Sequence, residues 1–265
     1  MYAGECFCLL GQNGAGMTIT LSTSTGIIPP TKGDITIRGR NAPEEAAAAR
    51  QTMGCCMQHD VLWDLLTVHE HILLFAMLQD RRLELATQEQ LLSELQVSNS
   101  CHTLGKELSG GMKRRLNVAL AILGEAPVDI LDEPTTGVDP YSRHQLWNVI
   151  RQRRMGRSFC FATHHMDEAY HLGDRICIFS KGRVACCGTG PFLKSRLGCG
   201  YYLRLLHTSR GFPSGPLLSL INSHLGAVCY VASEANQEVQ IQVPFSSGCE
   251  AWHPEEQCWT SSSQH

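Results

Sequence analysis

A glycine-rich loop near the start of the sequence has the residue types needed to hold a phosphate group. The segment Gly11-Gln-Asn-Gly-Ala-Gly-Met-Thr18 follows the apolar run Cys6–Leu10 and precedes a predicted helix. Glycines let the backbone curl so that several N–H groups point inward at a helix N-terminus, where an anion is stabilised. The loop departs from the phosphate-binding pattern GxxxxGK[ST], because Met17 stands where that pattern has a lysine. A glycine-rich turn that binds nothing is the alternative for this segment alone.

A second segment could hold a metal ion beside that phosphate. Val128-Asp-Ile-Leu-Asp-Glu133 reads as a mostly apolar strand that ends in two carboxylates. Asp132 and the Thr18 hydroxyl are the predicted Mg²⁺ ligands, since Mg²⁺ prefers oxygen ligands and keeps much of its water shell. Glu133 is predicted to orient or deprotonate a water molecule that attacks the phosphate. The alternative for this segment alone is a solvated strand end.

Two further residues could complete such a site. His164 follows the apolar run that ends at Thr163, and a histidine just past a strand end can hydrogen-bond a γ-phosphate. Gln58 ends the segment Gly54-Cys-Cys-Met-Gln58 and could reach the metal or the water. A structural histidine is the alternative for His164.

The segment Leu108-Ser-Gly-Gly-Met112 predicts a helix N-terminus open to an anion. Ser109 is a favoured N-cap residue, and Gly110 and Gly111 leave their N–H groups accessible. An ordinary capped helix is the alternative. The basic triplet Lys113-Arg-Arg115 that follows is predicted to be a solvated helix face.

The elements that must position these residues alternate between strands and helices. The predicted strands are Cys6–Leu10, Ile35–Ile37, Val128–Leu131, Ser158–Ala162, Ile176–Phe179 and Val184–Cys187. The predicted helices are Glu44–Gln51, Val68–Gln79, Gln88–Leu95, Met112–Leu123, Tyr141–Arg153 and Met166–His171. Short apolar strands between helices indicate an α/β fold with a mostly parallel sheet flanked by helices, whose ligand loops lie at the carboxyl ends of the strands.

The predicted organisation has three parts. Residues 1–206 form the main domain, in which residues 59–124 are an inserted helical subdomain that interrupts the alternation. A strand predicted at Tyr201–Leu206 ends the main domain. Residues 207–245 form a partial α+β appendage, with strands predicted at Ala227–Val231 and Glu238–Val243 and a helix at Leu217–Leu225. Residues 246–265 lack periodicity and are predicted to be a disordered tail.

Composition excludes several classes of protein. The 265 residues are 43% apolar and 18% charged, so the chain can bury a core and does not resemble a disordered protein. The net charge of −3 provides no basic field for nucleic acid. No run of 18 apolar residues and no signal peptide is found, so no direct membrane insertion by this chain is expected. The 13 cysteines are odd in number and lie mostly in apolar runs, which favours reduced thiols over disulfides or zinc ligands.

Taken in order, these segments resemble the nucleotide-binding domain of an ABC transporter. The matching motifs are the Walker A loop, the Q-loop glutamine, the LSGGM signature, Walker B, the D-loop Thr136-Gly-Val-Asp139 and the switch histidine. The sequence that flanks these motifs is similar to that of subfamily A, the lipid exporters, for example in Gln58-His-Asp-Val-Leu-Trp-Asp-Leu-Leu-Thr-Val68. The resemblance extends from Gly4 to Leu206 and continues faintly over 217–245, where it is similar to the start of that subfamily's regulatory domain.

The resemblance implies ATP and Mg²⁺ as cofactors and a P-loop NTPase-like fold. It implies Glu133, His164 and Gln58 as catalytic residues, and Thr18, Gln58 and Asp132 as metal ligands. It also implies a head-to-tail dimer in which Ser109, Gly110 and Gly111 serve the nucleotide of a second nucleotide-binding domain. The nucleotide-binding residues of this chain's own loop are Gly11, Asn13, Gly14, Ala15, Gly16, Met17, Thr18 and Ile19.

Transmembrane domains are the other implied partners, contacted around Asp60–His71, with the chain at the cytosolic face of a membrane, or in the cytoplasm if it is expressed as this fragment. The sequence departs from the family pattern in three places.

Met17 should weaken hydrolysis more than binding. Tyr2 lies nine residues before Gly11, roughly 30 Å from the loop in an extended strand, and is a poor adenine-stacking residue. Residues 246–265 match nothing in the family. Proteins of subfamily A normally carry their own membrane spans and this sequence shows none, so it resembles a fragment, a splice form or a decaying gene product.

Three functions compete at this level. The first is an ATP-binding domain that couples ATP binding and hydrolysis to lipid transport, with impaired turnover in its own site. The second is a non-catalytic dimerisation or regulatory module derived from such a transporter. The third is a soluble ABC ATPase that acts on ribosomes or DNA, which the acidic net charge disfavours.

Overall fold

The structure is a computed structural model that describes residues 1–42, 44–79, 85–197, 201–206, 214–225, 229–235 and 238–243. The chain divides into two compact units, Met1–Gly190 and Pro191–His265. All the predicted nucleotide-site residues lie in the first unit.

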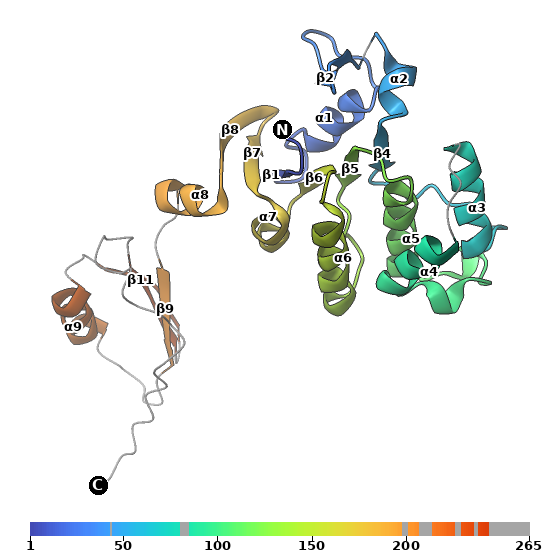
Figure 1. Cartoon of the computed structure of the whole chain (residues 1–265). Coiled ribbons are helices and arrows are strands. Elements are labelled where there is room, and N and C mark those ends of the chain that lie inside the picture. The colour runs from blue at the N-terminus through green and yellow to red at the C-terminus, as the bar shows by residue number, and fades with distance from the viewer. Residues whose placement is uncertain are drawn as a thin grey trace. The chain divides into compact units, whose positions relative to one another are not determined.

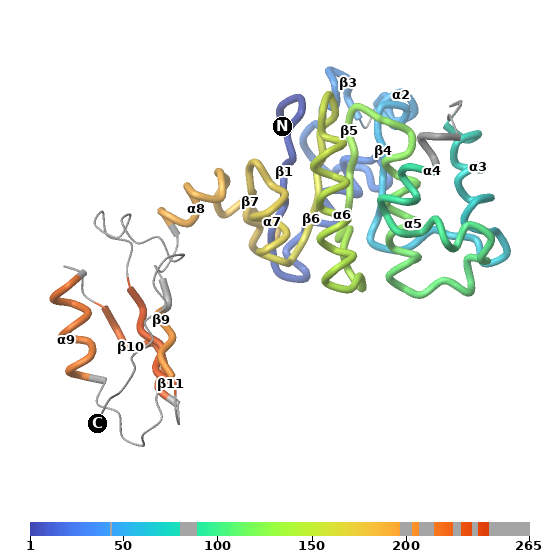
Figure 2. The backbone as a smooth tube through the Cα atoms, turned by 60° about the horizontal axis from the view of Figure 1, so that its bottom comes forward, coloured from blue at the N-terminus to red at the C-terminus, as the bar shows by residue number. Residues whose placement is uncertain are grey.

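A six-stranded sheet forms the centre of the first unit. Its strand order is β4-β5-β6-β1-β7-β8, and β8 alone runs antiparallel to its neighbour. Figure 2 shows β7, β1, β6, β5 and β4 lying side by side. The bounds are β1 Cys6–Gly11, β4 Met53–Cys56, β5 Val128–Asp132, β6 Ser158–Thr163, β7 Arg175–Ser180 and β8 Arg183–Gly188. The mostly parallel α/β fold expected from the sequence is confirmed.

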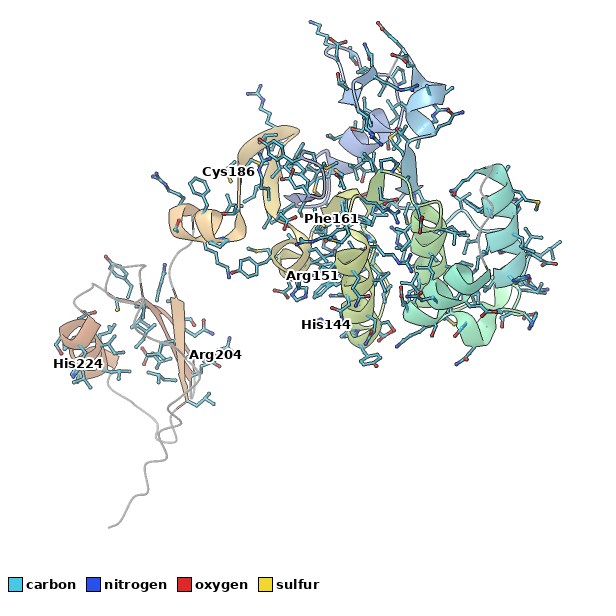
Figure 3. The ribbon with its side chains drawn as sticks, viewed as in Figure 1. His144, Arg151, Phe161, Cys186, Arg204 and His224 are labelled. Carbon is cyan, nitrogen blue, oxygen red and sulfur yellow. The ribbon has the colours of Figure 1, made fainter. Side chains whose placement is uncertain are left out.

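Helices cover both faces of this sheet. Helix α1 (Met17–Ser24) lies on one face, and α5 (Gly110–Leu123), α6 (Pro140–Arg153) and α7 (Met166–Leu172) lie on the other (Figure 1). Under α1, a core forms from the apolar side chains of the sheet and its neighbours: Leu9, Met17, Leu21, Ala42, Ala49, Met53, Ile130, Ala162 and Cys177. Phe161 on β6 is fully buried between the layers (Figure 3).

Short elements extend from the α1 side of the sheet. The expected strand at Ile35–Ile37 is part of an antiparallel ribbon, β2 (Thr36–Ile37) with β3 (Arg40–Asn41), followed by α2 (Ala46–Arg50). Strand β4 was not among the predicted strands. It pairs with β5 from Met53 opposite Val128 onward, and this pairing delivers Gln58 to the edge of the sheet where β5 ends.

The helical subdomain lies beyond β4, with α3, α4 and α5 grouped together (Figure 1). It contains α3 (Val68–Leu78), α4 (Leu85–Glu94) and the short 3₁₀ helices η1 (Ser98–Ser100) and η2 (Gly105–Glu107). Thr67 and Glu70 form a capping box that starts α3. His71 is fully buried, and its Nε2 accepts from the Trp63 N–H at 2.9 Å while its Nδ1 contacts the Thr67 carbonyl at 2.8 Å. The neutral Nδ1–H tautomer satisfies both contacts.

The second unit is a small α+β arrangement. Strands β10 (Tyr230–Ala235), β11 (Glu238–Val243) and β9 (Tyr201–Leu206) form an antiparallel sheet, and α9 (Ser214–Leu225) packs on it through Leu217, Leu218 and Ile221. Helix α8 (Gly190–Leu197) lies where the chain passes from one unit to the other. The strand Tyr201–Leu206, assigned to the main domain by sequence, pairs with β11 in this unit. The predicted tail, residues 246–265, lies outside the described residues.

Candidate functional site

The glycine-rich loop joins the carboxyl end of β1 to the N-terminus of α1. Gly16 caps α1 with φ of 101°, a left-handed conformation that other residues adopt at a cost. A Cβ at Gly11 would lie 2.9 Å from the Ala15 Cβ and 3.0 Å from the Phe179 carbonyl oxygen. The loop is tied from outside by Gly182 in the β7–β8 turn, whose N–H donates to the Ala15 carbonyl at 2.9 Å. The loop therefore has a fixed, tightly curled backbone.

The side chains of this loop divide between solvent and core. Asn13 and Gly14 are exposed, while Ala15 is buried. On α1 the Ile19 side chain is 63% exposed and faces away from the core. Met17 is 6% exposed and packs in the apolar core beneath the loop. At the lysine position of the pattern, an uncharged side chain thus fills the space under the loop.

Thr18 and Asp132 meet, as a metal site requires. Asp132 ends β5 and is fully buried, and the Thr18 hydroxyl lies beside its carboxylate. Burial raises the pKa of Asp132, and the neighbouring Glu133 raises it further, while the Thr18 hydroxyl lowers it. Among the described residues, neither carboxylate oxygen of Asp132 has a hydrogen bond of good geometry. A buried carboxylate without such a hydrogen bond raises the free energy of the folded chain, so this position favours a bound cation.

Glu133 is held by contacts to both oxygens of its carboxylate. Its Oε1 lies 2.7 Å from the Nδ1 of His164, and its Oε2 accepts from the Thr136 hydroxyl at 3.1 Å. The Glu133 backbone has φ of 52°, and its N–H donates to the Ala162 carbonyl at 2.9 Å. The turn after β6 is fixed by Thr163, whose hydroxyl accepts from the His165 N–H. Glu133 and His164, which the sequence singled out separately, are therefore in direct contact.

Gln58 lies close to this group through its backbone. Its carbonyl accepts from the Nη1 of Arg114 at 3.3 Å, and its side chain is exposed. The same arginine donates to the carbonyl of Glu133. Arg114, which the sequence analysis did not select as a site residue, therefore connects the Gln58 segment to the backbone at the end of β5.

Arg114 is the functional residue that sequence reasoning missed. The basic triplet was predicted to be a solvated face, but Arg114 is 3% exposed and that prediction is wrong for this residue. In α5 its position four residues before the buried Val118 places it on the apolar side of the helix. This helical spacing was the available signal.

The residues of the LSGGM signature, Leu108 to Met112, lie at the N-terminal end of α5, and the buried residues of this helix lie towards its C-terminal end. Ser109 caps the helix, its Oγ accepting from the Met112 N–H at 3.3 Å, and Ser109 and Gly110 are exposed. Gly111 lies against the backbone of Gly137, to whose carbonyl oxygen its Cβ position would be 3.1 Å away. The open N–H groups of this helix are thus presented on the surface.

Asp129, in the middle of β5, is a buried carboxylate with an arginine partner. The Nη2 of Arg157 lies 2.6 Å from its Oδ2, and Arg157 also donates to the carbonyls of Ala126 and Ile122. Burial raises the pKa of Asp129 to about 7, although the Arg157 charge acts to lower it. This pair links the middle of β5 to the end of α5 and the segment that follows it, which is a structural role.

Comparison with known families identifies the fold and the motif set. A sequence profile described as ABC transporter matches residues 1–136, just over half of the chain. The chain is 45% identical over 215 residues to the retinal-specific phospholipid-transporting ATPase ABCA4 of Mus musculus, covering 80% of this chain and 9% of that protein. It is 45% identical over 218 residues to the ATP-binding cassette sub-family A member 2 of Homo sapiens, with 82% and 9% covered.

A third relative is similar over a longer stretch. The phospholipid-transporting ATPase ABCA3 of Mus musculus is 39% identical over 249 residues, or 93% of this chain and 14% of that protein. The chain therefore spans only a small part of the curated relatives that it matches.

None of the helices in the described residues combines the length and apolar character required to span a membrane.

Solved structures give the same fold. An ATP-binding subunit of an ABC transporter matches with a TM-score of 0.66 and 30% identity, covering 74% of this chain and 82% of the other. The ATP-binding cassette MJ0796, solved as a dimer in a post-hydrolysis state with ADP and Pi, matches with a TM-score of 0.65 and 21% identity over 71% of this chain and 87% of the other. The resemblance inferred from the motifs is confirmed.

Proposed function

The chain belongs to the ABC transporter family, with subfamily A among its relatives, and we propose that it is an ATP-binding domain that binds ATP with Mg²⁺. The observation that supports this most directly is that the Thr18 hydroxyl, at the end of the glycine-rich loop, lies beside the buried carboxylate of Asp132, whose oxygens make no hydrogen bond of good geometry among the described residues. These segments are far apart in sequence, and the fold brings them to one edge of the sheet.

The residues present fit both groups. The curled backbone from Gly11 to Thr18 offers N–H groups to a phosphate tail at the start of α1. Thr18 and Asp132 would hold Mg²⁺, with Gln58 on the neighbouring segment as a third oxygen ligand. When bound, the ion would neutralise phosphate charge.

Glu133 is the proposed base. Its carboxylate is 2.7 Å from His164 and accepts from Thr136, so both oxygens are oriented. A carboxylate held in this way can accept the proton of a water that attacks the terminal phosphate. His164, half exposed at the end of β6, is then suited to hydrogen-bond that phosphate.

Turnover in this site is proposed to be impaired. Met17 supplies neither charge nor hydrogen-bond donor where the pattern has a lysine, and its side chain packs in the core. Loss of a charged hydrogen bond costs about 1.5–3 kcal/mol. Because charge neutralisation matters more in the transition state than in the ground state, hydrolysis should suffer more than binding.

The proposed partners are a second nucleotide-binding domain and transmembrane segments of a transporter. The exposed N-terminus of α5, at Ser109 to Gly111, suits the nucleotide of a head-to-tail partner. Since the relatives ABCA4 and ABCA3 are named as phospholipid-transporting ATPases, a lipid is the proposed class of cargo. The proposed location is the cytosolic face of a membrane, or the cytoplasm for this chain alone, and the proposed domain limits remain 1–206, with 59–124 inserted, 207–245 and 246–265.

Equilibrium binding of ATP to the purified full chain, with and without Mg²⁺, tests this proposal. We expect saturable binding that Mg²⁺ strengthens, and we expect Asp132→Asn to remove the Mg²⁺ effect. Asp167→Asn is a matched control, because Asp167 is an exposed carboxylate in the first turn of α7. Absence of binding at millimolar ATP would favour the second candidate, a non-catalytic module that dimerises without nucleotide.

A further inference from the structure

The guanidinium of Arg114 connects three segments that belong to different motifs. It extends from the second turn of α5, the helix that begins at Gly110 after the N-cap Ser109. It contacts the segment after β4, which carries Gln58, and the end of β5, which carries Asp132 and Glu133. Among the described residues, the hydrogen bonds that join these three segments through one side chain are those of Arg114.

The contacts to the end of β5 are made with backbone carbonyls. The Nε and Nη2 atoms of Arg114 donate to the Glu133 carbonyl at 3.1 and 2.9 Å, and Nη2 also donates to the Asp132 carbonyl. Glu133 has a left-handed φ of 52° and needs surrounding contacts to remain in that conformation. Arg114 thus fixes the backbone from which the proposed base projects.

The other side of the guanidinium binds the Gln58 segment. Nη1 donates to the Met57 carbonyl at 2.8 Å, to the Gln58 carbonyl at 3.3 Å and to the Asp60 Oδ1 at 3.1 Å. Asp60 is also bound from α5 by the Asn117 amide, at 2.7 Å. The segment is therefore attached to α5 at two points, one helical turn apart.

We propose that Arg114 is a positioning residue that couples the N-terminal end of α5 to Glu133 and Gln58 of the same chain. The guanidinium is planar and rigid, so a shift of α5 moves both attached segments together. This inference rests on the proposed function, because the coupling affects activity only if the chain binds ATP. Contact between the α5 N-terminus and a partner's nucleotide would be transmitted through Arg114 to this chain's own base.

Arg114→Lys tests the inference in the full chain, because lysine retains the charge but lacks the fork of donors. Arg115→Lys is the matched control. Arg115 is the next residue in α5, and its Nη1 contacts only Leu95 and Gln96, in the helical subdomain. Asp60→Asn is a second variant that weakens the same link from its less buried side, and it serves if Arg114→Lys does not fold.

We expect Arg114→Lys to leave the ATP dissociation constant and the KM for ATP within about twofold, because the phosphate loop lies on another segment. The turnover number is expected to fall roughly 10- to 100-fold, measured in the Met17→Lys background. A readout without turnover is amide hydrogen exchange. ATP should protect residues 57–60 and 132–136 in the parent chain and in Arg115→Lys, but protect them much less in Arg114→Lys and Asp60→Asn.

The outcomes separate this inference from the proposed function. If the parent chain does not bind ATP, the proposed function fails and this inference fails with it. If ATP binds but leaves exchange at residues 57–60 unchanged in the parent, the coupling is absent. If Arg114→Lys and Arg115→Lys behave alike in exchange and in turnover, ATP binding stands and the role of Arg114 is refuted.

Discussion

At the scale of single residues, the site combines groups suited to ATP chemistry with one that is not. Thr18, Asp132, Glu133 and His164 occupy one edge of the sheet with the contacts that the chemistry needs. Met17 is buried in the core below the same loop. The framework of the proposed site is therefore present, and the absence of a lysine at position 17 is its proposed defect.

Replacing Met17 by lysine should supply the positive charge that the phosphate-binding pattern has at this position. Lysine has a stem of similar length that can follow the path of Met17, with its ammonium group reaching the loop. We expect Met17→Lys to tighten ATP binding by about one to two decades, the value of a charged hydrogen bond. Isothermal titration of the full chain measures this, with Met17→Leu as the apolar control. Equal affinities for the two variants would show that the missing lysine is not the limiting defect.

The buried pair of Asp129 and Arg157 should make stability depend on pH. Burial raises the pKa of Asp129 from 3.8 to about 7 in the folded chain, so the folded state keeps a proton that the unfolded state has lost. Stability from this group therefore falls as pH rises from about 4 to about 7, and is constant above that range. Urea unfolding at pH 5 and pH 8 should show a larger loss for the parent chain than for Asp129→Asn. The same loss in both chains would contradict this assignment.

At the scale of elements, apolar pattern and loop chemistry predicted most of the first unit. Strands β1, β5 and β6 were found because they are short, apolar runs that each lead directly into a proposed site residue. Strand β4 was missed because Met53-Gly-Cys-Cys56 contains no β-branched residue and one glycine. Its identity depends on pairing with β5, which is information from distant residues.

Arg114 was missed for a related reason. A basic triplet on a helix usually faces water, and the partners that make burial of Arg114 favourable are backbone carbonyls of other segments. Carbonyl groups exist at every residue, so the sequence does not mark the ones that converge on a guanidinium. The contact of Glu133 with His164 was predictable, because each residue directly follows one of two neighbouring parallel strands.

The capping box of α3 provides a prediction at this scale. The Thr67 hydroxyl accepts from the Glu70 N–H at 3.2 Å, and the Glu70 carboxylate accepts from the Thr67 N–H at 2.7 Å. We expect Thr67→Ala to destabilise the first unit by about 1 kcal/mol. Thr67→Ser retains the hydroxyl and should cost less than Thr67→Ala. Thermal or urea unfolding measures the difference, and equal stability of the two variants would show that the cap contributes little.

At the scale of the whole molecule, the groups that would act on one nucleotide are divided between two surfaces. The phosphate loop and the carboxylates form one group, whereas Ser109, Gly110 and Gly111 present an exposed helix N-terminus from α5. An exposed helix N-terminus favours an anion, and a second copy of the chain could bring its own bound nucleotide to it. This division is what a head-to-tail dimer would require, and it leads to a test of assembly.

That assembly should depend on ATP, because the nucleotide would lie between the two chains and contribute part of the interface. We expect Glu133→Gln, which keeps the shape of the base but cannot accept a proton as readily, to populate a dimer with ATP and to remain monomeric without it. Adding Ser109→Arg should block the dimer by placing bulk and charge at the α5 N-terminus, while ATP binding in the chain's own loop persists. Sedimentation velocity at several ATP concentrations measures both effects. Dimerisation that is equally strong without ATP would instead identify the chain as a nucleotide-independent dimerisation module, because mass action then assigns no binding energy to the nucleotide at the interface.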